Sequence, residues 1–340
     1  NMVFPEAQPE EWLNCDQCTD CFKPAFNYRP KQSAQYALAI SNFEDSIDVP
    51  QRYNFGFIAS TDDHTARPGT GYKQYERRKM TFATGVKSKV WEYQYKAEDP
   101  NFPEIPKINP GESQPDSERV SSFVYPGGIL AVHAKGRGKD EIWSALKNKN
   151  VYGTSGPRIL LWFDLINSPD GHAPMGSEIT MSQNPQFIVK AAGSFKQNKG
   201  CSDESVDSLS SERLEYLCAG ECYNPSNERE VIEKIEIIKI TPQIYAGEAV
   251  NPLIQDPWKT IPCQGTGECI VKFEDENFSR DSVYYVRAIQ SSTSAINGSS
   301  LIQRDSFKLC KGSFRTDLKD DCLSMTNERA WSSPIYVNKP

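Results

Sequence analysis

From residue 158 onward, the chain consists mainly of strand-like segments that follow one another with few helical ones between them. Helical pattern in this part is found chiefly at residues 208–217. The strand-like segments are rich in β-branched and aromatic residues; they are 158–167, 186–192, 232–241, 269–273, 283–291 and 334–337. Runs of strands without crossover helices favour antiparallel pairing. We therefore expect residues 158–340 to form a disulfide-rich antiparallel β domain that resembles a sandwich.

The part before residue 158 has a different pattern, in which helical and strand-like segments alternate. Such alternation is typical of a parallel α/β sheet or barrel, so an α/β domain is expected over residues 1–157. The long polar stretch 62–124 is expected to be a loop that covers a site. The segments with periodic patterns are a helix at 31–43, a strand at 55–60, a strand at 127–133, a helix at 139–150 and a strand with a tight turn at 151–158.

Charge and hydropathy exclude two classes of partner. The net charge is -7, and clustered Lys and Arg, which phosphate contacts require, are lacking, so the sequence argues against nucleic-acid binding. No run approaches the roughly 18 apolar residues of a membrane span.

The ten cysteines indicate an oxidising compartment. They occur in local groups, and two of these, Cys263 with Cys269 and Cys310 with Cys322, look like small loops that a bridge would close. The spacing Cys15-x-x-Cys18-x-x-Cys21 could also begin an iron–sulfur or zinc site, but the next cysteine is Cys201. Disulfides are the favoured state, which predicts a secreted or periplasmic protein.

The strongest candidate for chemistry is the acidic and imidazole motif that follows the apolar run 55–59. Asp62 and His64 are two residues apart, so on an extended backbone both point to the same face. A carboxylate and an imidazole together suit a divalent metal such as zinc, manganese or iron. The alternative is a polar turn in which Asp62 caps local backbone amides.

Three further residues are candidates for catalytic roles. Asp63 could transfer protons or orient His64. Arg67 and Arg158 could hold an anionic substrate group, because guanidinium matches phosphate oxygens in a fork, although either could instead form a structural salt bridge. Of the other histidines, His133 is expected to be packed and His172 to lie in an exposed turn.

Four stretches of the chain, in this order, resemble a large and mostly bacterial family that carries the label domain of unknown function 3604 (DUF3604). They are residues 21–30, 55–69, 151–159 and 330–337. This family is similar to the PHP superfamily of metal-dependent phosphoesterases, which implies a distorted β/α barrel for residues 1–157. The resemblance also implies that Asp62 and His64 match the superfamily's last Asp-x-His pair of metal ligands, and that residues 127–154 match the closing unit of the barrel.

The chain departs from that superfamily in lacking a histidine before His64, so the opening His-x-His motif is missing. It therefore resembles the C-terminal half of a family member, and the N-terminal half of the same polypeptide or a companion chain is expected to complete the site. The start at Asn1 has no charged and apolar leader pattern, which fits a removed leader or, as we favour, the later part of a longer polypeptide.

The function implied by the resemblance is hydrolysis of a small anionic ester, most simply a phosphoester, by a metal-dependent enzyme. Two alternatives stay open. One is a non-catalytic extracellular binding protein with a residual site, and the other is a hydrolase of another ester class such as a sulfate.

Overall fold

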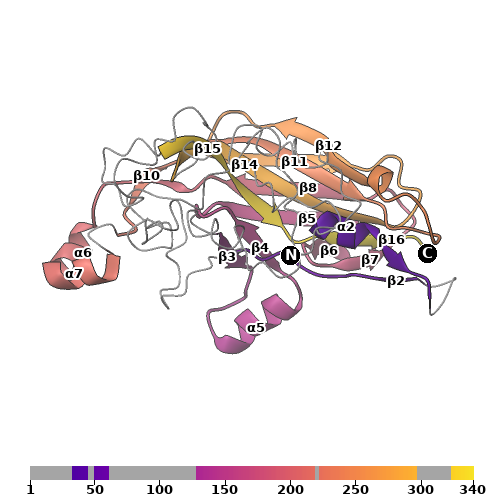
Figure 1. The fold of residues 1–340 in the computed structure, drawn as a ribbon, viewed down its shortest axis with the longest axis horizontal. Helices are drawn as coiled ribbons and strands as arrows, with labels where there is room; N and C mark the ends of the chain where they lie inside the picture. The colour runs from indigo at the N-terminus through magenta and orange to yellow at the C-terminus, as the bar shows by residue number, and fades with distance from the viewer. Residues whose placement is uncertain (1–32, 45–49, 61–127, 219–221, 297–322) are drawn as a thin grey trace, which may run out of the picture.

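A computed structural model describes residues 33–44, 50–60, 128–218, 222–296 and 323–340 (Figure 1). Within these ranges the fold consists mainly of two β-sheets. The larger has eight strands, in the order β12 (Ile254–Pro262), β11 (Ile232–Ile240), β14 (Ser282–Ile296), β15 (Leu323–Ser332), β4 (Val151–Thr154) and β3 (Ile129–Val132), with β16 (Ile335–Asn338) paired to β14 and β7 (Glu178–Thr180) paired to β16. The smaller has four, in the order β13 (Glu268–Glu274), β8 (Gln186–Ala192), β5 (Leu160–Ser168) and β6 (Gly171–Pro174).

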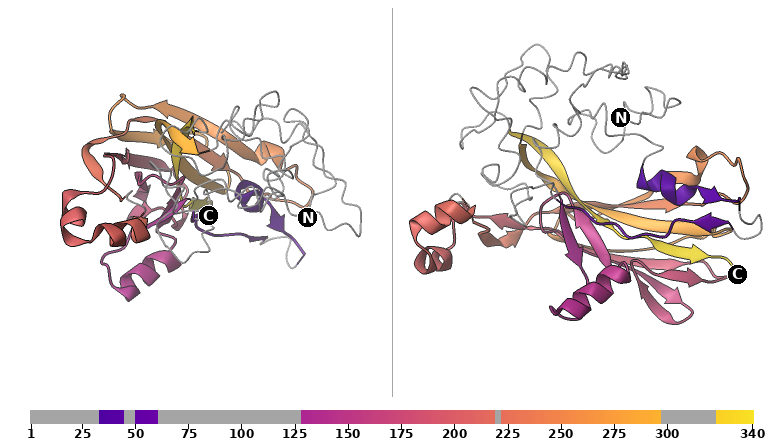
Figure 2. Two further views of the ribbon diagram at one scale, coloured as in Figure 1. Left: turned by 60° about the vertical axis from the view of Figure 1, so that its left-hand side comes forward. Right: turned by 60° about the horizontal axis from the view of Figure 1, so that its bottom comes forward.

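Short elements complete the described part of the chain. Two ribbons are formed by β1 (Ser41–Asn42) with β2 (Gln51–Arg52), and by β9 (Phe195–Gln197) with β10 (Pro225–Arg229). The helices are α2 (Ala34–Ala39), α5 (Lys139–Lys147), α6 (Asp203–Ser208), α7 (Ser211–Cys218) and a 3-10 turn, η5 (Asn251–Leu253). Helices α6 and α7 project from one end of the sheets, and α5 lies on the outside of β3 and β4 (Figures 1 and 2).

The main core lies between the two sheets, which gives a sandwich-like arrangement. Alternate side chains of the small sheet point inward, because successive residues of a strand face opposite sides. Phe163 and Phe187 stack with their ring centroids 5.3 Å apart, and Phe187 also meets Phe273 at 4.9 Å. Tyr284 of the large sheet lies 4.8 Å from Phe187, so aromatic contacts join the two layers.

A second cluster covers the outer face of the large sheet. Leu38 and Ala39 of α2 are buried against Ile238, Ile240 and Tyr285. Strand β11 is therefore buried on both faces, which explains its run of isoleucines.

The outer face of the large sheet also buries a charge network. Arg287 donates to Glu236 at 2.9 Å and to both carboxylate oxygens of Asp256. Gln35 of α2 donates to Asp256 at 2.5 Å and so joins the helix to the network. The two carboxylates accept hydrogen bonds from the buried guanidinium and balance its charge. The bond from Gln35 to Asp256 then fixes how α2 packs on the sheet.

The antiparallel β architecture expected for the second half is confirmed. Each of the six segments predicted as strands overlaps an observed one: β5, β8, β11, β13, β14 and β16. Among the described pairs only β16 with β7 is parallel. Helix α5 confirms the helix predicted at 139–150, α2 is a shorter form of the one predicted at 31–43, and the pattern at 208–217 corresponds to α7 and the end of α6.

The expectation of a parallel strand–helix–strand unit at 127–154 is wrong. Strands β3 and β4 are direct neighbours and pair antiparallel, with α5 in the connection between them. Strand β4 also pairs antiparallel with β15, so both strands belong to the large sheet. The described residues form open sheets and no closed barrel. The sheet runs across the expected boundary near residue 157, and the division into two domains stays a prediction.

The strand predicted at 55–60 is also not observed; this segment is irregular. Its backbone amides bond to side-chain hydroxyls instead of a neighbouring strand, since Tyr336 Oη accepts from Phe55 N at 2.8 Å and Ser333 Oγ accepts from Phe57 N at 2.9 Å. Its apolar character comes from packing, because the Phe57 ring meets Tyr285 edge-on at 5.0 Å.

Two disulfides are present among the described residues. Cys263–Cys269 confirms the small bridged loop expected from the sequence, and Cys201–Cys222 closes the longer loop that contains α6 and α7. The groups Cys15, Cys18, Cys21 and Cys310, Cys322 lie outside the described residues. None of the helices in the described ranges has the length and apolar character needed to cross a bilayer.

Candidate functional site

The motif Asp62, Asp63 and His64, with Arg67 after it, lies outside the described residues, but the segment that leads into it is described. The carbonyl oxygen of Ser60 accepts a hydrogen bond from Gly128 N at 3.1 Å. Ala59 lies against Gly153 of β4 and Gly128, the residue before β3, and a Cβ built at Gly153 would be 2.7 Å from Ala59 Cβ. The absence of a side chain at Gly128 and Gly153 therefore lets the segment approach the sheet closely.

A tight turn follows β4 at the same edge of the sheet. Ile129, next to Gly128, is paired with Thr154, so the Ser60 peptide and this turn are neighbours. Gly156 has a φ of +129° and its amide bonds to Thr154 Oγ1 at 3.2 Å. Because residues with a side chain rarely adopt such a φ, the turn requires glycine at this position.

The buried carboxylate of Glu328 binds the turn through Ser155. Glu328 is fully buried, and its Oε2 accepts from Ser155 Oγ at 2.5 Å. Its other oxygen, Oε1, accepts from Thr293 Oγ1 at 3.1 Å. Ser155 also bonds through its amide to Arg329 O at 2.9 Å. These contacts fix the turn to β14 and β15, so the backbone that leads to Arg158 is held in place.

Arg158 itself is exposed, and its guanidinium carbon lies 3.9 Å from the centroid of the Tyr223 ring. This is close enough for a cation–π contact. The sequence singled out Arg158 as a possible anion ligand; in the structure it follows the turn after Thr154, and the strand partner of Thr154 is Ile129, next to the Gly128 that bonds to Ser60.

The other two histidines, His133 and His172, lie outside the Asp62–His64 motif. His133 is packed as expected, since its ring meets Tyr152 and Trp162 and its Nε2 lies 2.8 Å from Leu161 O. His172 is exposed, and it lies in β6 beside the expected turn. Burial raises the pKa of Asp164, and this is partly opposed by electrostatic interactions with His172, Lys190 and His133.

The described residues contain no group of three or more His, Cys, Asp or Glu side chains arranged to hold a metal. Asp62 and His64 therefore remain the candidate ligands from this chain, and a complete metal site would need donors from outside the described ranges.

Sequence reasoning missed two residues of this region. Tyr223 is distant from Arg158 in sequence, and a tyrosine in a cysteine-rich loop carries no periodic signal. Glu328 lies in β15 between two polar residues, Asn327 and Arg329, a stretch for which the sequence predicted no strand. A glutamate two residues before the buried Ala330 would have been the signal, because alternation places both on one face.

Comparison with protein families matches residues 43–199 to the family described as "Protein of unknown function (DUF3604)", which supports the assignment suggested by the sequence stretches. The matched range includes the Asp62–His64 motif and the turn that carries Arg158. Neither the curated proteins nor the solved structures give a match.

Proposed function

We propose that this DUF3604-like chain contributes part of the active site of a metal-dependent hydrolase that acts on a small anionic ester, most simply a phosphoester. The observation that supports it is a series of backbone contacts that links the segment before Asp62 to the turn before Arg158. Ser60, two residues before Asp62, is bonded to Gly128, whose neighbour Ile129 pairs with Thr154 at the start of the turn that carries Arg158.

The chain's own residues would divide the work as follows. Asp62 and His64 would be metal ligands, because their carboxylate and imidazole are suitable donors for zinc, manganese or iron. A metal bound there would lower the pKa of a coordinated water and polarise the ester oxygen. Arg67 and Arg158 would hold the anionic group, and Asp63 would orient His64 or accept a proton.

The remaining ligands would come from an N-terminal half of the same polypeptide or from a companion chain. Asp62 and His64 alone are too few, because a catalytic zinc site uses three protein ligands. The two disulfides fit an oxidising compartment, so we place the enzyme outside the cell or in the periplasm.

Elemental analysis of the protein purified from its native source, with its partner segment, tests the proposal directly. Near-stoichiometric metal and turnover of bis(p-nitrophenyl) phosphate are expected, and both should be lost in D62A/H64A. The chain offers a matched control, because Asp170 and His172 have the same Asp-x-His spacing and both are exposed. D170A/H172A should keep metal and activity. A protein without metal that still binds a glycan or protein partner would support the non-catalytic alternative instead.

A further inference from the structure

The ring of Tyr223 lies against the face of the Arg158 guanidinium, at 3.9 Å from ring centroid to guanidinium carbon. Arg158 is exposed, whereas Tyr223 is half-buried, so the ring is the better fixed member of the pair. Stacking uses the face of the guanidinium, while phosphate oxygens bind its N–H edge, so both contacts can be made together. Tyr223 can therefore restrict a flexible side chain without blocking its anion-binding edge.

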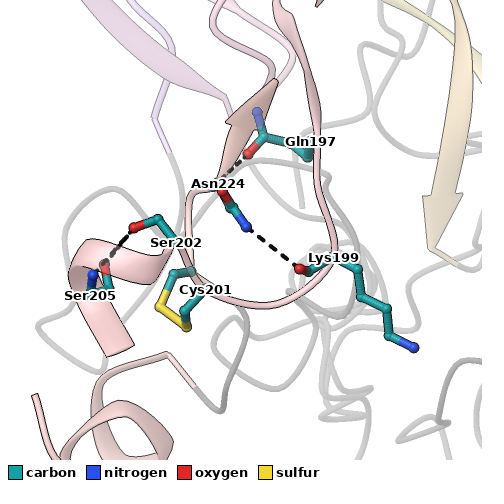
Figure 3. Close-up of a disulfide and its surroundings, with 7 residues drawn as sticks. Gln197, Lys199, Cys201, Ser202, Ser205 and Asn224 are labelled. Atoms are coloured by element: carbon teal, nitrogen blue, oxygen red, sulfur yellow. Dashed lines mark hydrogen bonds between the residues drawn. A yellow bond between two sulfur atoms is a disulfide. The ribbon is translucent and has the colours of Figure 1, made fainter. Parts of the chain in front are cut away.

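The residues on both sides of Tyr223 are held in place, and Figure 3 shows the disulfide at Cys201 and the hydrogen bonds of Asn224. Cys222, directly before it, is bridged to Cys201. Asn224, directly after it, donates from its amide to Gln197 Oε1 at 2.9 Å, accepts from Asn198 N at 2.7 Å through its carbonyl, and directs its side-chain amide to Lys199 O at 3.5 Å. The bridge and these hydrogen bonds tie the backbone at Tyr223 to the end of β9.

The same bridged loop contains a second arginine–tyrosine pair that serves as a comparison. The guanidinium carbon of Arg213 lies 5.4 Å from the Tyr216 ring centroid, within α7. Both residues are exposed and belong to the projecting helices. This pair has the same chemistry as Arg158 with Tyr223 but lies inside the loop, away from the turn.

We propose that Tyr223 is a positioning residue for Arg158, and that the Cys201–Cys222 bridge fixes it beside the turn so that the guanidinium edge is presented to an anionic substrate group. This inference rests on the anion-binding role of Arg158 in the proposed function. It assigns the bridged loop between β9 and β10 a part in substrate affinity.

The test follows the Arg158 side-chain ¹⁵Nε–¹H signal in the full chain, assigned with R158K, during titration with inorganic phosphate. In the wild type the ring current of Tyr223 should displace this signal, and phosphate should shift it further. Y223L should abolish the ring-current displacement and weaken phosphate binding by about five-fold. Y223F, which keeps the ring, should restore both within two-fold, and Y216L should leave both unchanged. In C201A/C222A the ring remains but its displacement of the signal should fall.

The outcomes separate this inference from the function on which it rests. Equal phosphate affinity in wild type and Y223L, with a phosphate-dependent Arg158 signal, would overturn the positioning role and leave the proposed function intact. An Arg158 signal that phosphate does not move would refute the anion-binding role and the positioning role together. The ring-current difference between wild type and Y223L is measured without phosphate. If that difference is absent, the stacking of Tyr223 on Arg158 is refuted.

Discussion

Replacing Gly153 by alanine tests how closely the segment 55–60 packs against the large sheet. In a strand interior, alanine is normally preferred to glycine by about 0.5–1 kcal/mol, so the sequence alone predicts stabilisation. Here the added Cβ would lie 2.7 Å from Ala59 Cβ and 3.0 Å from Ala59 N. Contacts this short force one of the two segments to move.

The effect of G153A on the free energy of unfolding can be estimated from the overpacking that the added Cβ causes. Overpacking a well-packed position costs about 1–3 kcal/mol, and the strand preference of alanine returns part of it. We therefore expect G153A to lower the free energy of unfolding by about 1–2 kcal/mol. Strand β4 is paired on both sides, whereas Phe57 is held through the hydroxyl of Ser333, so the displaced part should be the segment that leads to Asp62.

Urea unfolding followed by far-UV circular dichroism measures this change. A59G/G153A removes the Cβ–Cβ contact and should recover at least half of the lost free energy. G128A is the contrasting variant, because a Cβ there meets the Thr154 carbonyl oxygen as well as Ala59, so A59G should fail to rescue it. The reasoning is refuted if G153A is as stable as the wild type, or if A59G rescues G128A but not G153A.

Three further predictions concern stability. R287A leaves the Asp256 carboxylate without its cation and removes one of the two cations paired with Glu236, the other being Lys234; it should cost about 3–5 kcal/mol in urea unfolding, much of it recovered in R287M/E236Q/D256N. C263A/C269A opens a short loop and should cost about 2 kcal/mol by the loop-entropy estimate, measured by urea unfolding under oxidising conditions; an unchanged free energy of unfolding would contradict this. Burial opposes ionisation of Glu236, but Lys234 and Arg287 outweigh it and lower its pKa below the usual 4.5. A lowered acid pKa stabilises the fold above about pH 4.5 and loses that effect as the pH falls, so the gap in unfolding free energy between wild type and E236Q should shrink between about pH 5 and 3; an unchanged gap would contradict this.

The antiparallel strands of the second half were predictable because their side chains alternate. In β8 the inward residues Phe187, Val189 and Ala191 are separated by Ile188 and Lys190, and the predicted range 186–192 matches the observed strand. Strand β12 was missed because it contains two prolines, and β15 because polar side chains dominate it; their neighbours in the sheet supply the pairing. Local sequence does not record such long-range partners.

The pairing of β3 and β4 could not be read from the chain either. A strand, a helix and a strand in series fit both a parallel crossover and an antiparallel neighbour, and the choice depends on β15, which pairs with β4 from far along the sequence. The apolar run at 55–60 was predicted as a strand because Phe55 and Phe57 are apolar. They are partly buried by packing against the large sheet, and periodicity cannot separate that from strand pairing.

The candidate site was predictable only through its own residue types. Arg158 stands out in the sequence because it follows a glycine-containing turn. Its stacking partner Tyr223, and Glu328, which bonds to Ser155 of the turn, come from distant segments, so only the folded arrangement shows that they lie near it.

The position of β4 in the large sheet has a consequence for biosynthesis. Ser333 Oγ donates to Val151 O at 2.5 Å across a separation of 182 residues, and β15 pairs with β4 beside it. Closing so large a chain loop is slow, because its entropy is lost before the contacts form. A nascent chain on the ribosome would keep the open edge of β4 available until residues 323–333 emerge, and a chaperone that shields strand edges would act in that interval.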